Sequence, residues 1–262
     1  MSKPVQPVPF ELQKHAAEAI VENIYAHTVG LAGYPPVFLG SAVAIRWKGR
    51  ALVVTADHVI KGVDDSQLLF APRPPVPLKL NDGPQDAMRG RVHRLEKLPV
   101  IRRYRQEAKD VAALEVPLEL EEQRPLLRFY DLSESLKLPR PMPESVTMIG
   151  FPGDALEQPS PGVWTFSGHL LTAQPQRYTG QTLKDFLPRS NFPLTFPPAT
   201  DGRKPQGFSG TGIWYQSNMP KTELWVPKLI LLGICTSYYD RSQLLCALRI
   251  ERILTFLREF VG

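Results

Sequence analysis

The chain has 262 residues, of which 43% are hydrophobic and 22% charged, and its formal net charge is +5. This composition excludes a disordered chain, and the length allows one large domain or two small ones. The 27 prolines cannot lie in helix interiors or central strands, so they favour short strands joined by turns. No run can span a bilayer, and residues 1–9 lack the apolar stretch of a signal peptide. We therefore expect a cytoplasmic protein that does not act at a membrane.

One amphipathic helix is expected before the β-rich part of the chain. Within residues 10–27, Ala17, Ile20, Val21 and Ile24 recur at the spacing of one helical face. The pattern then changes to that of strands. Residues 37–45 and 51–56 are rich in β-forming side chains, and the basic, glycine-containing residues between them predict a hairpin turn.

Further short strands and a final helix follow in chain order. The strands are expected at 66–70, 90–95, 111–116, 145–150, 163–171, 212–215, 229–238 and 244–249. Many short strands between Pro- and Gly-rich turns predict an all-β sandwich or barrel. Residues 250–261 place their apolar side chains on one helical face and predict a C-terminal helix. Residues 174–206 have no sustained period and predict a long, functional or disordered loop.

Lys and Arg are dense between Arg89 and Lys109. Such a segment can attract an anionic partner. We favour a solvated loop, because no interleaved aromatic residues and no nucleic-acid-binding motif accompany the charges. We therefore expect no nucleic-acid partner.

Three polar residues lie where a reactive group is easily held. His58 follows the apolar strand at 51–56, and Asp110 begins the apolar strand at 111–116. Ser209 lies in the string Gly-Phe-Ser-Gly, whose glycines allow a tight turn that directs backbone amides at an oxyanion. A serine becomes a nucleophile only when a base takes its proton and an acid orients that base. Singly, each residue is better interpreted as structural; jointly, they fit this chemistry.

Four short sequence segments, taken in chain order, form a recognisable pattern. They are Gly40-Ser41-Ala42 through Thr55-Ala56-Asp57-His58-Val59, then Asp110-Val111-Ala112-Ala113-Leu114, Gly150-Phe151-Pro152-Gly153 and Gly207-Phe208-Ser209-Gly210. This order resembles the trypsin-like serine peptidases, most of all the disulfide-poor bacterial branch that includes glutamyl endopeptidases. The resemblance extends from about residue 37 to the end of the chain.

The resemblance implies a chymotrypsin-like fold of two six-stranded antiparallel β-barrels, to which the helical periodicities add an N-terminal and a C-terminal helix. Residues 1–33 would form an N-terminal helical extension. Residues 34–130 would form the first barrel, which carries His58 and Asp110. Residues 131–262 would form the second barrel, which carries Ser209, together with the C-terminal helix.

The resemblance also implies a serine endopeptidase that needs neither metal nor cofactor and acts on a protein or peptide. His58 would be the general base, Asp110 would orient it, and Ser209 would be the nucleophile. The amides of Gly207 and Ser209 would form the oxyanion hole. The substrate pocket would be lined by Arg203, Lys204, Thr236, Ser237 and Tyr238. As a hypothesis, Arg203 and Lys204 form a cationic floor that favours an acidic side chain before the scissile bond.

Chain order argues against other hydrolases. An α/β-hydrolase needs a histidine after its serine, and none follows Ser209. A subtilisin-like order needs an aspartate well before the histidine, but the first aspartate, Asp57, adjoins His58. The H-E-x-x-H pattern of metallohydrolases is absent from the sequence.

Departures from the family pattern leave two alternatives open. Phe208 and Thr211 flank Ser209 where secreted family members have Asp and Gly, and Asp57 replaces a small residue beside the histidine. The protein is then either a protease that stays latent until an activating partner orders the long 174–206 segment, or an inactive protease-fold binding or regulatory module.

The remaining histidines and the cysteines are interpreted as structural. The histidines are His15, His27, His93 and His169. Cys235 and Cys246 are too few for a disulfide scaffold, and we expect free thiols that pack as small apolar residues on neighbouring strands.

Overall fold

The structure is a computed structural model of the chain. It describes residues 10–71, 95–124, 127–133, 142–151, 156–160, 163–166, 168–178, 183, 186–196, 205, 207–217 and 226–262. His93, Arg203, Lys204 and all but the last residue of the strand expected at 90–95 lie outside the described residues.

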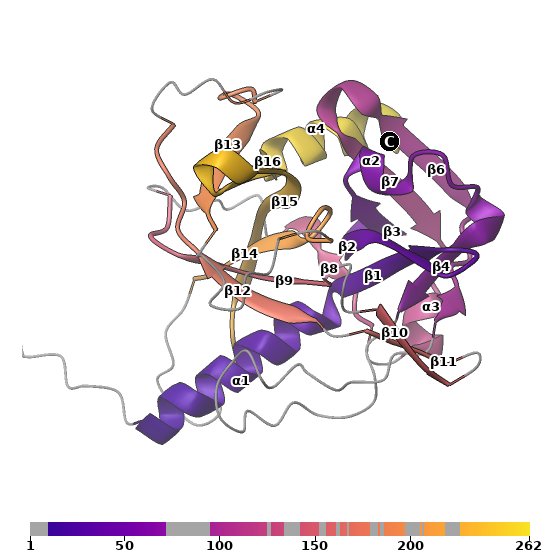
Figure 1. The fold of residues 1–262 in the computed structure, drawn as a ribbon, viewed down its shortest axis with the longest axis horizontal. Helices are drawn as coiled ribbons and strands as arrows, with labels where there is room; N and C mark the ends of the chain where they lie inside the picture. Colours follow the sequence, from indigo (N-terminus) through magenta and orange to yellow (C-terminus); the bar gives the residue numbers. More distant parts are fainter. Residues whose placement is uncertain are drawn as a thin grey trace, which may run out of the picture.

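The first sheet is built mainly from the N-terminal half of the chain (Figure 1). Its strands are β1 (Thr28–Gly33), β2 (Val37–Trp47), β3 (Arg50–Thr55), β4 (Leu68–Ala71), β5 (Glu96–Lys97), β6 (Arg102–Gln106), β7 (Val111–Val116) and β8 (Tyr130–Asp131). Their order is β5-β4-β1-β2-β3-β7-β6, and β8 pairs in parallel with β2. All other pairs in this sheet are antiparallel.

The second sheet follows in the C-terminal half. Its strands are β9 (Val146–Gly150), β12 (His169–Ala173), β13 (Asn191–Thr195), β14 (Gly212–Gln216), β15 (Leu229–Tyr239) and β16 (Leu244–Arg249). Their order is β12-β9-β14-β15-β16-β13, with antiparallel pairing throughout. A separate hairpin joins β10 (Leu156–Ser160) to β11 (Val163–Phe166).

Four helices complete the described structure (Figure 1). They are α1 (Phe10–Ala26), α2 (Asp57–Ile60), α3 (Leu120–Gln123) and α4 (Ile250–Phe260). No helix among the described residues is long and apolar enough to cross a membrane.

Each sheet buries both faces, which explains its nearly continuous apolar strands. Along β3, Ala51 and Val53 belong to a core inside the first sheet, whereas Leu52 and Val54 belong to the core shared with the second sheet. Side chains alternate across a strand, so a strand buried on both faces must be apolar throughout. The prediction of an all-β fold with two curled antiparallel sheets and terminal helices is confirmed.

The first sheet has eight strands rather than the six expected. Among the strands that the sequence did not predict, β5 and β8 have only two residues each and no sequence period. A third, β1, falls within residues 1–33, which we had assigned to a helical extension, and pairs with both β2 and β4. Its glycine-rich sequence carries little of the usual strand signal.

Three local predictions are corrected. The expected loop between Arg89 and Lys109 contains β6, and the expected loop at 174–206 contains β13. The strand expected at 163–171 is divided between β11 and β12. β13 pairs with the distant strand β16, which local periodicity does not report, whereas β6 and β11 pair with the neighbouring strands β7 and β10.

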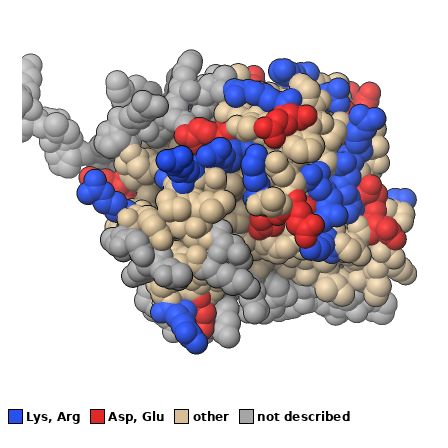
Figure 2. All heavy atoms as spheres, turned by 90° about the horizontal axis from the view of Figure 1, so that it is seen from above, with Lys and Arg blue, Asp and Glu red and all other residues tan. Residues whose placement is uncertain are grey.

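Basic side chains of the Arg89–Lys109 segment are balanced by carboxylates. Arg103 pairs with Asp65, Arg105 with Asp57, and Lys109 with Glu259. Figure 2 shows acidic side chains lying among the basic ones on the face of the molecule seen from above. Within the described residues 102–109, these three cations are therefore paired with carboxylates, which reduces the positive potential of this part of the surface.

Candidate active site

His58 lies just beyond the end of β3, on the single turn of helix α2. Its neighbours Asp57, Val59 and Ile60 are buried and fix this turn against the first sheet. The His58 side chain itself is 49% exposed, so its imidazole remains accessible. A rigid strand end can hold an accessible imidazole in the fixed position that proton transfer requires.

Asp110 precedes β7, which pairs with β3 so that Ala112 lies opposite Thr55. This register brings Asp110 beside His58. The Asp110 backbone is left-handed, with a φ of 50°, which an aspartate tolerates better than most residues. The left-handed turn leads from the 3₁₀ turn Glu107–Lys109 into the strand.

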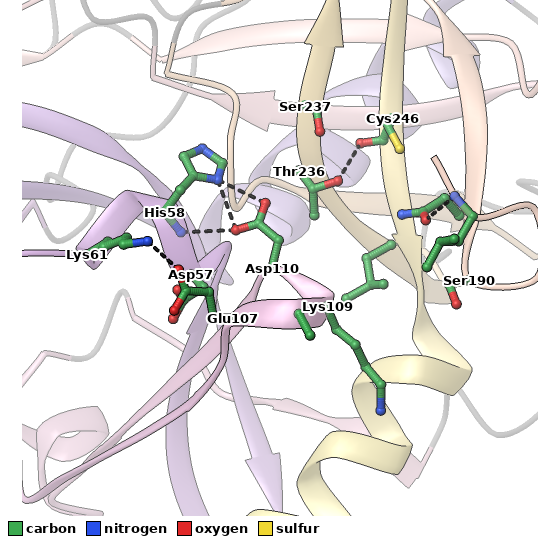
Figure 3. A pocket seen from close by; sticks show the side chains of 14 residues that line it. Asp57, His58, Lys61, Glu107, Lys109, Asp110, Ser190, Thr236, Ser237 and Cys246 are labelled. Carbon is green, nitrogen blue, oxygen red and sulfur yellow. Dashed lines mark hydrogen bonds and ion pairs between the residues drawn. The ribbon is translucent and has the colours of Figure 1, made fainter. Parts of the chain in front are cut away.

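The Asp110 carboxylate accepts hydrogen bonds from both the ring and the backbone of His58 (Figure 3). The Nδ1 to Oδ2 distance is 2.9 Å, and the backbone N to Oδ1 distance is 3.0 Å. The hydrogen bond from Asp110 is the main cause that raises the pKa of His58 above 6.5. With Nδ1 donating to Asp110, the neutral ring keeps the Nε2 lone pair free to accept a proton.

Ser209 belongs to a tight loop before β14. The amide of Gly210 donates to the carbonyl of Cys235 on β15 at 2.7 Å, and the amide of Thr211 donates to the carbonyl of Phe208 at 2.9 Å. By contrast, the amides of Gly207 and Ser209 donate no hydrogen bond to any residue that the structure describes. Two free amides beside a serine are what an oxyanion hole requires.

Ser41 on β2 connects the Ser209 loop to the first sheet. Its amide donates to the carbonyl of Ser209 at 2.8 Å, and its hydroxyl donates to the carbonyl of Gly207 at 2.8 Å. The hydroxyl of Thr55 donates to the Ser41 carbonyl at 2.7 Å. Thr55 precedes His58 by three residues, so these bonds fix the serine loop close to the histidine turn.

Gly210 explains why a glycine follows the serine. Its φ is 86°, and a Cβ there would lie 1.8 Å from the Ser41 carbonyl oxygen. A side chain is therefore excluded by both the backbone conformation and the contact. Phe208 and Thr211, the two departures from the family pattern, are both buried.

No hydrogen bond joins the side chains of His58 and Ser209 in the described structure. Sequence reasoning named three residues, and the structure pairs two of them directly and fixes the third nearby through Ser41. Their chemical roles stay predictions.

A cavity of about 430 Å³ lies beside the His58–Asp110 pair, between the two sheets (Figure 3). Thr236 and Ser237 of β15 line it together with His58 and Asp110, as expected for a substrate wall, whereas Ser209 does not. The Thr236 hydroxyl donates to the carbonyl of Cys246. Tyr238 packs its ring against Phe196. Their contact with a substrate stays a prediction.

In the described part of the chain, the side chains of the other histidines and of the two cysteines make no hydrogen bond to the three candidate catalytic residues. His27 is buried, its Nδ1 donates to the carbonyl of Arg128, and burial lowers its pKa to about 4. His15 is exposed on α1, and His169 begins β12. Both cysteines are free and buried on neighbouring strands, as expected. Burial raises the pKa of Cys246 to about 11 and that of Cys235 further, so neither thiol is a nucleophile at neutral pH.

Sequence reasoning missed one pair at this site. The buried carboxylate of Asp57 binds the guanidinium of Arg105 on β6 through two hydrogen bonds. From the sequence, Asp57 is only a departure from the family pattern, and Arg105 belongs to a predicted solvated loop. The one available signal was the alternation of arginines with Tyr104, which is typical of a strand with one buried face.

No model of a known protein family matches the chain, and no curated protein matches it. No group of three or more potential metal-ligating side chains lies among the described residues. Function is therefore inferred from the order of the motifs and from the geometry of the site.

Proposed function

We propose that this chain is a serine endopeptidase that acts through His58, Asp110 and Ser209. The observation that carries the proposal is a combination of two features on opposite sheets. Asp110 binds both the ring and the backbone of His58, and the Ser209 loop, fixed to the end of β3, has two amides that donate to no residue in the described part of the chain. Acyl transfer needs both an oriented base and a pair of free donors.

In the proposed reaction, the Ser209 hydroxyl oxygen attacks the carbonyl carbon of a peptide bond, and its proton passes to Nε2 of His58. The amides of Gly207 and Ser209 stabilise the negative oxygen of the tetrahedral intermediate. The C–N bond then breaks as His58 returns the proton to the leaving amine. Water, deprotonated by the same imidazole, hydrolyses the acyl-enzyme and restores Ser209.

Asp110 supports both steps without reacting. Its hydrogen bond to Nδ1 fixes the ring tautomer, and its negative charge favours the imidazolium that forms when His58 takes the proton. A triad of this kind contributes on the order of a millionfold in turnover.

The preference for an acidic residue before the scissile bond remains part of the proposal, through Arg203 and Lys204. Peptide libraries with acidic, basic or neutral residues at that position test it. Faster cleavage of the acidic peptides supports a cationic floor, whereas preferential cleavage after Lys or Arg contradicts it.

The latent alternative also has a specific observation in its favour, because no hydrogen bond joins His58 to Ser209 in the described structure. A site held in this state needs a small movement before the proton can pass. Cleavage of casein by the isolated protein at a rate that no added protein increases would contradict latency.

A fluorophosphonate probe tests the proposal, since it labels only a serine that an adjacent base has activated. We expect labelling of the native protein and none of Ser209→Ala. The matched control is Ser190→Ala, which removes a serine that lines the cavity and should leave labelling unchanged. Failure of the folded native protein to react would contradict the enzyme and favour a binding module.

A further inference from the structure

A buried ion pair lies directly behind the His58 turn. The Asp57 side chain is only 2% exposed, and Arg105 is 35% exposed at the edge strand β6. Arg105 Nε lies 2.6 Å from Oδ1, and Nη2 lies 2.8 Å from Oδ2. A buried carboxylate without such a partner is strongly unfavourable, so Arg105 is what allows an aspartate at this position.

The pair has a direct geometric relation to the candidate site. Asp57 is the first residue of α2, and His58 is the next residue. Both side chains line the cavity beside Asp110. The two hydrogen bonds to Arg105 therefore tie α2 to β6, while the bonds of His58 to Asp110 tie it to the start of β7.

We propose that Arg105 is a positioning residue, which holds the His58 turn through Asp57 and offsets the charge of this second carboxylate near the imidazole. The catalytic meaning of this inference rests on the proposed function. Its electrostatic content does not, because His58 titrates whether or not the protein is an enzyme.

Apart from Asp110, which binds His58 itself, the other charged side chains around His58 have partners of opposite charge. Those that line the cavity are Asp57, Lys61, Glu107, Lys109 and Asp110, together with the buried thiol of Cys246. Lys61 pairs with Glu107, and Lys109 lies 3.8 Å from Glu259. On β6, Arg103 pairs with Asp65. Loss of Arg105 would therefore leave a second carboxylate, that of Asp57, without a cationic partner next to His58.

Removing the charge of Arg105 and removing the charge of Asp57 should shift the pKa of His58 in opposite directions. Asp110 is the main cause of the raised pKa of His58, and the charge of Asp57 adds to it. Arg105→Gln leaves the Asp57 charge without its cation, so the pKa of His58 should rise. Asp57→Asn leaves the cation without its carboxylate, so the pKa should fall. The double variant should return the pKa close to that of the native protein.

The experiment is an NMR titration of the His58 ring signals, together with the rate of fluorophosphonate labelling as a function of pH. The acid limb of the labelling profile should move to higher pH in Arg105→Gln and to lower pH in Asp57→Asn. At neutral pH, Arg105→Gln should also label between about ten- and a hundredfold more slowly, because the His58 turn is less well held.

Arg102→Gln is the matched control, because it removes the same charge from the same strand. Arg102 lies over the ring of Tyr104, with 5.9 Å from its Cζ to the ring centroid, and should leave both readouts unchanged. If Arg105→Gln does not fold, Arg105→Lys serves as the second variant, because it keeps the charge but not the bidentate hydrogen bonding to Asp57. It should then preserve the pKa of His58 and still slow labelling.

Identical titration curves and labelling rates in Arg105→Gln and Arg102→Gln would overturn the inference. So would shifts of the same sign in Arg105→Gln and Asp57→Asn. If the two variants show the expected opposite shifts in the NMR titration but the probe never labels the native protein, the proposed function fails, and the electrostatic effect of the pair on His58 stands.

Discussion

Ser41 takes no part in the proposed bond changes, yet it is hydrogen-bonded to both sheets. It is fully buried on β2, and its hydroxyl donates to the carbonyl of Gly207 while accepting from the amide of Phe151 at 3.1 Å. It thus fixes the residue that begins the serine loop and the residue that follows β9. A small hydroxyl side chain satisfies two buried backbone groups here, which an alanine cannot do.

Ser41→Ala should therefore cost about 2 kcal/mol of stability, because both backbone groups lose their partner in a buried place. Fluorophosphonate labelling of Ser209 should also slow, since the Gly207 carbonyl is no longer held. Urea denaturation measures the first effect. Ser217→Ala is the control, because its exposed hydroxyl also donates to a backbone carbonyl. Equal midpoints for the two variants would contradict the role given to Ser41.

His27 provides a pH test that is independent of catalysis. Its pKa is lowered from 6.5 to about 4, chiefly by burial, so below pH 6.5 the unfolded chain binds a proton that the folded protein refuses. Stability should fall as pH drops from 6.5 toward 4, by about 3 kcal/mol in total at 1.36 kcal/mol per pKa unit.

His27→Asn keeps a donor for the Arg128 carbonyl but cannot titrate. The loss of stability that His27 causes between pH 6.5 and 4 should therefore disappear in this variant. Chemical denaturation at several pH values between 4 and 7 measures the effect. His15→Asn, at an exposed position of α1, should keep the native dependence on pH. The idea is wrong if His27→Asn loses stability over this interval as steeply as the native protein does.

At the scale of elements, the strands best predicted from the sequence are those that form an uninterrupted apolar run. β7 and β16 were predicted with their observed bounds, because each is a short apolar run between turn signals. β13 was missed although Phe192, Leu194 and Phe196 alternate and are buried. Pro193 obscured the pattern, and β13 tolerates it because it lies at the edge of the sheet.

The same distinction applies to the candidate site. Motif order was enough to name His58, Asp110 and Ser209, because each lies in a short recognisable string. The Asp57–Arg105 pair joins residues 48 positions apart, and its meaning depends on β6 being a strand. The charge of Arg105 alone could not reveal this pair, since a dense run of arginines does not show whether they lie on a loop or on a strand.

The β2–β3 turn offers a prediction at this scale. Lys48 and Gly49 both have positive φ, at 47° and 79°, as a two-residue hairpin turn requires. A Cβ at Gly49 would meet nothing within 4 Å, so the cost of Gly49→Ala is conformational and should be about 1 kcal/mol. Lys48→Asn should stabilise the protein slightly, because asparagine tolerates this backbone better. Urea midpoints that rank in any other order would refute the reading of this turn.

At the scale of the whole molecule, one hydrophobic core joins parts that the sequence presents as separate. It contains Tyr25 of α1, Leu52 of the first sheet, Trp214 and Leu248 of the second, and Phe256 of α4. Because both sheets bury one face in this shared core, separating the two sheets would expose apolar surface to water.

We therefore expect the two sheets to unfold together. Calorimetry should show a single transition whose calorimetric and van't Hoff enthalpies agree, as two-state unfolding requires. Phe256→Ala should lower the temperature of that one transition without splitting it, at a cost of about 3–5 kcal/mol for a fully buried ring. Phe260→Ala is the control, because Phe260 lies one turn further along α4 and is exposed. Two resolved peaks in the native protein, or a shift confined to one of two peaks in Phe256→Ala, would mean that the sheets are stable separately and that the shared core is not what couples them.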